Sequence, residues 1–143
     1  KGLLYVGSDN AAGSRGKVLV RDSAGAYTVS DTGAGGTTNI NNGYLAMVEF
    51  EDNLYASYWT SDTSIIRKFN GSAWSTVYTG VAGTIRPFIL LIVDNGVLFA
   101  FGGGKLLTAV VLTTPDGTAW TNQTAQLPEA DHTLLPVYGV EIL

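Results

Sequence analysis

The apolar and polar positions of this chain follow one repeated pattern, which is clearest in residues 86–104. An apolar run, Pro87 to Val93, is followed by the polar turn Asp94-Asn95-Gly96 and a second apolar run, Val97 to Phe101. Two apolar runs around a Gly-containing polar turn predict a β-hairpin. No window shows the 3.6-residue spacing of an amphipathic surface helix. The chain is therefore expected to be all-β.

Short strand candidates separated by Gly, Asn, Asp and Ser continue along the whole chain. The expected strands are residues 3–7, 17–22, 27–30, 44–50, 54–59, 64–69, 74–78, 87–93, 97–101, 106–112, a strand that begins at 120, and 136–143. Between two of them, Asn70-Gly71 is the strongest hairpin signal. The run Gly102-Gly103-Gly104 is expected to be a tight turn. It does not precede a helix, which argues against a phosphate cradle.

These strands form three repeats that align on aromatic positions. One position, always preceded by Leu, is occupied by Tyr5, Tyr55 and Phe99. Another follows a Gly-containing turn and an Ala, and is occupied by Tyr27, Trp74 and Trp120. Successive copies of the first position are 50 and 44 residues apart, and 49 if the end of the chain is joined to its start. Each repeat has four strands.

The two ends of the chain complete one repeat between them. Pro87 lies 12 residues before Phe99, and Pro136 lies 12 residues before Tyr5 when Leu143 is followed by Lys1. The chain is therefore cut in the turn between the first and second strands of a repeat. Residues 136–143 are expected to be a first strand that belongs beside residues 3–7.

A four-stranded unit that recurs every 40 to 50 residues resembles the blade of a β-propeller. The resemblance implies one domain, residues 1–143. Blade 1 would be about residues 1–32, completed by 136–143, with blade 2 about 43–80 and blade 3 about 86–124.

Three blades cannot close a ring, since closed propellers have about four to eight. We therefore expect a homodimer that closes as a six-bladed ring, in which the C-terminal strand completes a first blade. The variant interpretation is that the chain is part of a longer propeller.

A β-trefoil is the alternative fold, because it also has three four-stranded repeats in a chain of this length. Trefoil strands alternate apolar and polar residues strictly, whereas the first strands here are apolar on both faces. The Gln-x-Trp mark of trefoil lectins is also absent. The pattern therefore favours the propeller.

One turn, Thr114 to Trp120, resembles the Asp-box of sialidase-type propellers, with Asp116 one residue closer to the aromatic than usual. The resemblance implies a structural role. The Asp side chain would cap the turn and the Trp would pack between blades.

Composition excludes several function classes. The net charge is −4, and only Arg67 and Lys68 are adjacent basic residues, so nucleic acid is not an expected partner. Cysteine is absent and the longest apolar run is far shorter than a membrane span. The expected location is extracellular or on a cell or virion surface, and a cytoplasmic one remains open.

Candidate catalytic and metal-ligating residues are few. His132 is the single histidine and follows Asp131 directly, which does not favour a catalytic triad. Glu49 and Glu141, both in first strands, are the best carboxylate pair for a glycoside hydrolase. The stretches 8–10 and 62–64 carry oxygen ligands without the spacing of a calcium loop. No cofactor or metal is expected.

The connections between strands are the best candidates for a binding surface, because propellers bind ligands with such loops. The candidate ligand-binding residues are Asp9, Asn10, Arg15, Asn42, Trp59, Asp62, Arg86, Asp131 and His132. Small polar residues with an aromatic suit carbohydrate. The expected function is a non-catalytic, lectin-like or surface-attachment module that recognises a glycan or a protein. The alternatives are a structural domain of a larger surface or virion assembly and a propeller-type glycoside hydrolase.

Overall fold

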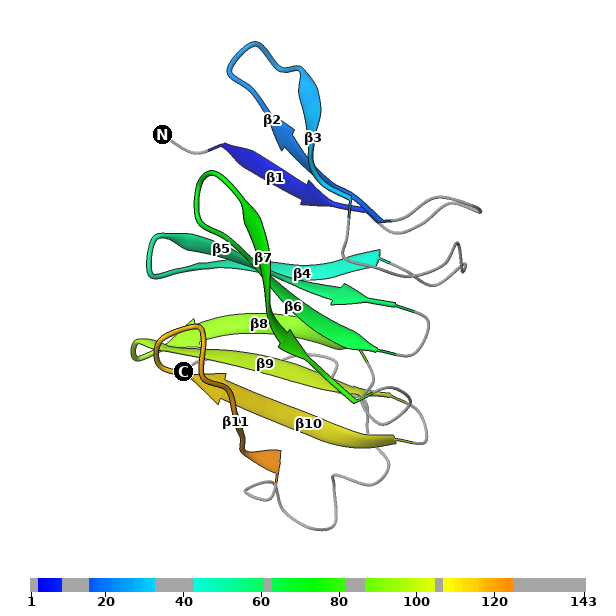
Figure 1. Ribbon diagram of the computed structural model, residues 1–143, viewed down its shortest axis with the longest axis vertical. Helices are drawn as coiled ribbons and strands as arrows, with labels where there is room; N and C mark the ends of the chain where they lie inside the picture. The colour runs from blue at the N-terminus through cyan, green and yellow to red at the C-terminus, as the bar shows by residue number, and fades with distance from the viewer. Residues whose placement is uncertain are drawn as a thin grey trace.

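The protein is an all-β molecule whose strands form three antiparallel sheets, stacked along its long axis (Figure 1). The computed structural model describes residues 3–8, 16–32, 43–60, 63–81, 87–104 and 107–124. Within these ranges there is no α-helix, and no helix is long and apolar enough to cross a membrane.

Each sheet is built from strands that are consecutive in the chain. Sheet 1 consists of β1 (Leu4–Gly7), β2 (Val18–Arg21) and β3 (Tyr27–Asp31). Sheet 2 consists of β4 (Gly43–Phe50), β5 (Asn53–Trp59), β6 (Ser64–Phe69) and β7 (Trp74–Thr79). Sheet 3 consists of β8 (Phe88–Asp94), β9 (Val97–Gly104), β10 (Leu107–Thr114) and β11 (Thr121–Asn122).

The strand registers of the sheets repeat in detail. The first two strands of sheets 2 and 3 share one irregularity: pairing shifts between Tyr44 and Ala46 in β4, and between Phe88 and Leu90 in β8. The two bulges are 44 residues apart, the same offset that aligns Tyr55 with Phe99. A bulge inserts one unpaired residue into a strand and re-aims its neighbours. Its recurrence is compatible with sheets 2 and 3 being repeats of one unit.

Sheet 1 shares a second bulge with sheet 2. The extra residue lies in the last strand of each sheet: Ser30 of β3 is skipped in the pairing with β2, and Val77 of β7 is skipped in the pairing with β6. Tyr27 and Trp74, which the sequence pattern aligns, are each the first residue of the last strand of their sheet. Each pair of neighbouring sheets therefore shares one bulge, which is compatible with the three-repeat arrangement predicted from the aromatic positions.

The glycine run in β9 differs from its prediction. The sequence predicts a tight turn at residues 102–104, whereas β9 continues through Gly104 and pairs with β10. Gly103 has a φ of 147°, and a Cβ there would lie 3.1 Å from the Ala109 Cα. The glycines therefore extend the strand where β10 approaches closely.

Two apolar cores join the sheets. The core between sheets 2 and 3 consists of Phe50, Tyr55, Ile66, Phe88, Leu91, Leu98, Ala100, Val110 and Leu112. The core between sheets 1 and 2 is smaller and consists of Val18, Tyr44, Ala56, Tyr58 and Ile65. Burial of each large apolar side chain contributes about 1.5–3 kcal/mol, so these layers are the main source of stability.

The two sheet junctions share one type of strand contact. β8 contacts β4 and β5, and β1 contacts β4. The β1–β4 contact is equivalent to the β5–β8 contact, since each joins the second strand of one repeat to the first strand of the next. The described strands form three separate sheets and no closed barrel, which disfavours the trefoil alternative. Residues 136–143 lie outside the described ranges, so their place in blade 1 remains a prediction.

Candidate functional site

The ends of the strands divide the molecule into two edges. Tight turns join β2 to β3, β4 to β5, β6 to β7, β8 to β9 and β10 to β11 at one edge. The C-terminal ends of β1, β3, β5, β7 and β9 all point to the opposite edge, at the right of Figure 1. We refer to this second edge as the connection edge, because most of the longer connections start there.

Most candidate binding residues fall in these connections, outside the described ranges. Those residues are Asp9, Asn10, Arg15, Asn42, Asp62, Arg86, Asp131 and His132. Trp59 alone of the nine is described. It is half-buried and is the last residue of β5, where it is paired with Gly43 and Ser64. It therefore stands at the connection edge, and the grouping of the nine into one surface remains a prediction.

Hydrogen bonds hold the bases of two connections. The Ser8 backbone N–H donates to the Lys17 carbonyl (2.8 Å), and the Lys17 N–H donates to the Ser8 hydroxyl (3.0 Å). In the next repeat the Thr60 N–H donates to the Thr63 carbonyl (3.0 Å), and the Thr63 N–H donates to the Thr60 hydroxyl (3.0 Å). A Ser or Thr closes both connections, so their two ends are fixed on the scaffold.

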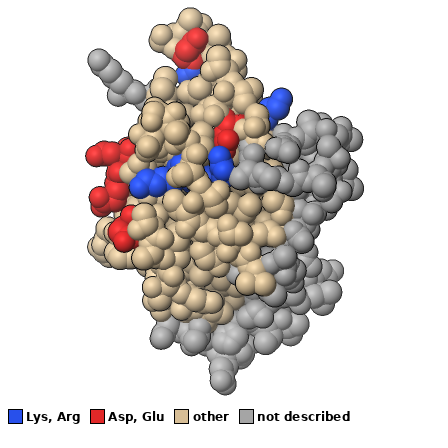
Figure 2. Space-filling model, viewed as in Figure 1, with Lys and Arg blue, Asp and Glu red and all other residues tan. Residues whose placement is uncertain are grey.

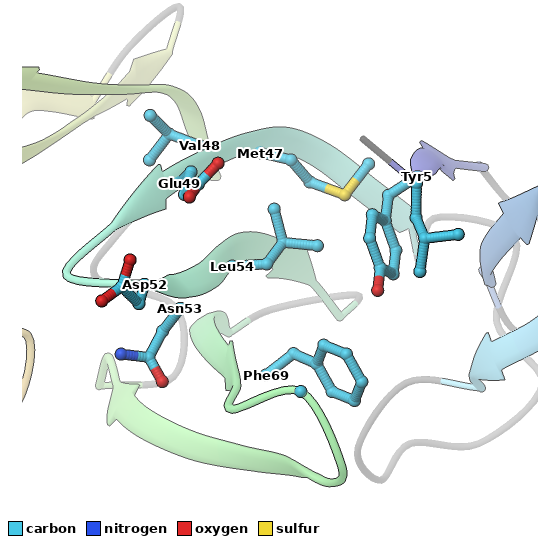
Figure 3. A pocket seen from close by; sticks show the side chains of 10 residues that line it. Tyr5, Met47, Val48, Glu49, Asp52, Asn53, Leu54 and Phe69 are labelled. Carbon is cyan, nitrogen blue, oxygen red and sulfur yellow. The ribbon is translucent and has the colours of Figure 1, made fainter. Parts of the chain in front are cut away.

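A pocket of about 480 Å³ lies between sheets 1 and 2, toward the tight-turn edge. Its lining residues are Leu3, Tyr5, Met47, Val48, Glu49, Asp52, Asn53, Leu54, Phe69 and Gly71. Figure 3 shows Tyr5, Met47 and Phe69 at one end, and Glu49, Asp52 and Asn53 at the other. The rings of Tyr5 and Phe69 are 6.0 Å apart between centroids. The pocket thus has an apolar, aromatic end beside β1 and a polar end beside the β4–β5 turn.

The polar end belongs to an acidic edge. Figure 2 shows acidic side chains gathered where the β4–β5 and β8–β9 turns lie. Glu51 and Asp52 both have positive φ, 51° and 57°, as a two-residue hairpin turn requires. A shallow hollow lined partly by Glu49, Glu51 and Asp52 adjoins the pocket. Within the described ranges, no group of three or more His, Cys, Asp or Glu side chains could hold a metal ion.

The proposed carboxylate pair is not placed symmetrically. Glu49 is exposed and pairs with Leu54, as Val93 pairs with Leu98. The join of the chain ends puts Glu141 at the position of Ile92, one residue earlier in the repeat. Successive side chains of a strand point to opposite faces. The two carboxylates would therefore point to opposite faces of their strands, which does not support them as a catalytic pair. Glu141 itself is outside the described residues.

A polar cluster joins sheets 1 and 2 near the connection edge. The Arg67 guanidinium pairs with both oxygens of Asp31, with Nε to Oδ2 at 2.9 Å and Nη2 to Oδ1 at 3.1 Å. The Tyr44 hydroxyl donates to Asp31 Oδ2, and Arg67 Nη1 donates to the Thr76 hydroxyl. Burial and then the Asp31 bond raise the pKa of Tyr44 above its ordinary value. Each partner of the ion pair is satisfied, which makes this cluster a clasp between the sheets and not a reactive site.

The sequence carries a signal for this clasp. The registers align Arg67 with Leu19 in sheet 1 and with Leu112 in sheet 3. A charged residue where both other repeats have Leu indicates a buried charge, which needs a partner of opposite sign. The partner, Asp31, lies 36 residues away in another sheet. The pattern of one repeat does not predict which acidic residue pairs with Arg67.

The Asp-box-like turn is structural, as the resemblance implies. Asp116 Oδ1 accepts hydrogen bonds from the N–H groups of Thr118 (2.8 Å) and Ala119 (2.9 Å) and from the Thr114 hydroxyl (2.9 Å). These bonds lower the pKa of Asp116 below its ordinary value. Trp120, which follows the turn, packs against the core between sheets 2 and 3.

The same cap recurs in the other two repeats. Asn70 Oδ1 accepts from the Ala73 N–H (2.9 Å), and Asp22 Oδ1 accepts from the Ala26 N–H (2.8 Å). In all three turns the capped residue is the Ala before the aromatic.

Comparison of the chain with known proteins gives no matching family model, no matching curated protein and no matching solved structure. Function is therefore argued from the geometry alone.

Proposed function

We propose that the three sheets are blades of a β-propeller. The support is the recurrence of strand order, bulges and capped turns in units of 44 to 50 residues, together with one equivalent strand contact, β1–β4 and β5–β8, at the two sheet junctions. Four antiparallel strands per repeat, stacked face to face, are the architecture of such blades. Two chains of three blades each would close a six-bladed ring.

The function that this geometry supports best is non-catalytic recognition at the connection edge. The observation that carries it is the set of closed loop bases: a rigid scaffold holds the ends of two connections by paired Ser or Thr bonds. Loops that differ in length and composition on a repeated scaffold are the usual place for binding residues. The connection edge would hold Trp59 and the eight loop residues predicted from the sequence.

We propose carbohydrate as the ligand class. Asp and Asn side chains bind sugar hydroxyls, and an indole such as that of Trp59 stacks on the apolar face of a sugar ring. A two-chain ring would present each site twice, and multivalency strengthens attachment to surfaces that display many copies of a weak ligand. An extracellular or cell- or virion-surface location fits such a role.

A glycan array tests this proposal with the full chain. The expected result is binding to a restricted set of sugars. In Trp59→Ala, affinity should fall by about tenfold or more, the effect of truncating a central aromatic contact. The matched variant Trp59→Phe, which keeps an aromatic ring, should retain most of the binding. Wild-type protein that binds no sugar on the array would contradict the carbohydrate proposal and favour a structural role in a larger assembly.

A glycoside hydrolase is the third candidate, and one experiment separates it from the others. A hydrolase that uses Glu49 and Glu141 would lose turnover of an aryl glycoside in Glu49→Gln, with sugar binding intact. We expect no turnover by the wild-type chain, since the two carboxylates occupy different positions of the repeat.

A further inference from the structure

One face of sheet 1 exposes apolar side chains, and the other repeats bury several of the side chains at the same positions. The exposed residues are Leu4 (52% exposed), Val6 (37%), Tyr27 (52%) and Val29 (51%). Pairing places Leu4 opposite Arg21 and Arg21 opposite Tyr27, so these positions share one face. Val6 pairs with Leu19, and Leu19 pairs with Val29, so these three residues share that face as well. We refer to this surface as the outer face of sheet 1.

The equivalent positions in the other sheets lie at sheet junctions. Leu98 and Ala100, the counterparts of Leu4 and Val6, are fully buried between sheets 2 and 3. Ala56, the counterpart of Val6 in sheet 2, is fully buried against sheet 1. Trp120, the counterpart of Tyr27, packs on the same junction as Leu98. In every repeat but the first, the preceding sheet covers this face.

The edge of sheet 1 differs from the other sheets in a second way. β5 pairs with β4 and β6, and β9 pairs with β8 and β10. Among the described strands, β1 pairs with β2 alone. β1 is the second strand of its repeat, so the strand expected at its other side is a first strand. An apolar, unpaired strand edge of this kind readily accepts another strand.

Residues 136–143 have the sequence of a first strand. Pro136 takes the position of Pro87, and the following residues take those of β8. In β8, Val93 pairs with Leu98 and Leu91 with Ala100. In the corresponding register Ile142 would pair with Leu4, and Val140 with Val6. Leu143 has the repeat position of Phe50, whose ring centroid lies 5.9 Å from that of Tyr55. By this equivalence Leu143 would lie beside Tyr5, at the apolar end of the pocket.

A second copy of the chain also offers a matching sheet face. On the side of sheet 3 away from sheet 2, Phe99 and Phe101 stack with centroids 6.0 Å apart. The counterparts of Phe99 each approach the hairpin-turn glycine of the next sheet. Tyr55 lies against Gly117, and Tyr5 lines the same pocket as Gly71. By this rule Phe99 needs the Gly25 turn of a following sheet 1, and a second copy of this chain can place that turn there.

We propose that β1 and the outer face of sheet 1 bind a second copy of this chain, through its residues 136–143 and the Phe99 face of its sheet 3. This inference rests on the proposed ring and deepens it by naming the surfaces and the register. One partner supplies both elements, because residues 136–143 follow sheet 3 in the chain. Across a two-fold axis the exchange occurs twice and leaves no open face. On this account the pocket between sheets 1 and 2 receives the partner's C-terminal residues and does not bind a small ligand.

Cysteine cross-linking tests the register, since the natural chain has no cysteine. Chains carrying Leu4→Cys are refolded together with chains carrying Ile142→Cys and mildly oxidised. Directly opposed residues of antiparallel strands have Cα atoms about 4.5–5.5 Å apart, within disulfide range. We expect a disulfide-linked pair of chains on a non-reducing gel. The same experiment with Val140→Cys in place of Ile142→Cys, two residues out of register, should give little product.

A second pair of variants tests the face itself. Val6→Asp puts a charge on the outer face of sheet 1, at a position whose counterparts Ala56 and Ala100 are fully buried. Thr28→Asp puts the same charge on β3, at a residue that is exposed on the other face of the sheet. Val6→Asp should halve the native mass, and its circular dichroism spectrum should still be that of a folded β protein. Thr28→Asp should leave the mass unchanged. A two-chain mass without the Leu4–Ile142 cross-link would overturn the strand exchange alone. A one-chain mass, or a disulfide within one chain in the doubly substituted protein, would overturn the inference while leaving the glycan-binding proposal to its own test.

Discussion

Arg67 of β6 and Asp31 of β3 form a two-pronged ion pair between neighbouring sheets, with Nε–Oδ2 and Nη2–Oδ1 distances of 2.9 and 3.1 Å. Their side chains are only 10% and 12% exposed. Near this pair the Trp74 indole donates to the Ser30 hydroxyl at 2.9 Å. The third strand of sheet 1 is therefore attached to sheet 2 by polar contacts, whereas sheets 2 and 3 are joined by a larger apolar core.

Removal of one partner of this pair should destabilise the protein strongly. Asp31→Ala leaves the Arg67 guanidinium buried without its counter-charge, and we expect a loss of about 3 kcal/mol in the free energy of unfolding. The double variant Asp31→Val/Arg67→Leu restores the Leu found in the other two repeats, so it should lose less than Asp31→Ala. Urea unfolding measures both. A double variant that loses as much stability as Asp31→Ala, or more, would contradict this account of the clasp.

Two tyrosines should respond oppositely to loss of their hydroxyl. Tyr44→Phe removes a hydrogen bond to the Asp31 carboxylate and should cost about 1.5–3 kcal/mol. The Tyr55 hydroxyl is buried without a hydrogen-bond partner in the described part of the chain. Tyr55→Phe should therefore be neutral or stabilising, since it removes an unsatisfied polar group. Equal losses in the two variants by chemical unfolding would show that the assigned hydroxyl contacts are wrong.

Tyr44 also predicts how stability changes at high pH. Its pKa is raised above the ordinary value of 10.0, mainly by burial and then by the Asp31 bond. The unfolded chain therefore loses this proton at lower pH than the folded chain. The contribution of Tyr44 is fully present below pH 10, and above it stability should fall by up to about 1.4 kcal/mol per pH unit. Tyr44→Phe should show a correspondingly flatter decline between about pH 10 and 11. An unchanged slope would exclude Tyr44 as its source.

Gly117 and Gly71 occupy equivalent turns but differ in their surroundings. Both have positive φ, 70° and 92°. A Cβ at Gly117 would lie 1.8 Å from the Tyr55 Oη, whereas nothing lies within 4 Å of one at Gly71. Gly71→Ala should cost only the backbone strain, about 1–2 kcal/mol. Gly117→Ala adds a clash between sheets and should cost at least about 1 kcal/mol more. Similar thermal unfolding of the two variants would contradict the close packing of this turn on sheet 2.

Asp116 should stabilise its turn most at neutral pH. Its folded pKa lies below the ordinary 3.8, so its contribution is present above that value and is lost as the pH falls toward the folded pKa. Asp116→Asn should still fold, because Asn70 caps the equivalent turn with the same bonds. Wild type should be more stable than Asp116→Asn at pH 7, and this advantage should shrink at about pH 3. A constant advantage would show that the charge does not matter.

Local pattern predicted the strands well, because hydrophobic runs and turn residues act over a few positions. The limits of β6, residues 64–69, were predicted to the residue, and the alignment of Tyr27 with Trp74 is confirmed by the registers. The exception is Gly102–Gly104, where close approach of β10 keeps glycine in an extended strand. Three glycines in a row predict a turn by propensity, and tertiary packing overrides that preference.

Contacts between repeats were less accessible to sequence analysis. The Asp31–Arg67 pair depends on how two sheets stack, which no single repeat specifies. The candidate binding site was predicted as loop positions, and of these the structure describes only Trp59. Side chains of loops are placed by the particular connection and not by the repeat, so the pattern that predicts the strands says little about them.

The native mass of the full chain tests the central proposal, that these sheets are three blades of a two-chain ring. One chain has a mass of 15.1 kDa. Sedimentation equilibrium or light scattering at micromolar concentration should give twice that value, independent of concentration over a wide range. A stable, folded species of 15.1 kDa would contradict the ring.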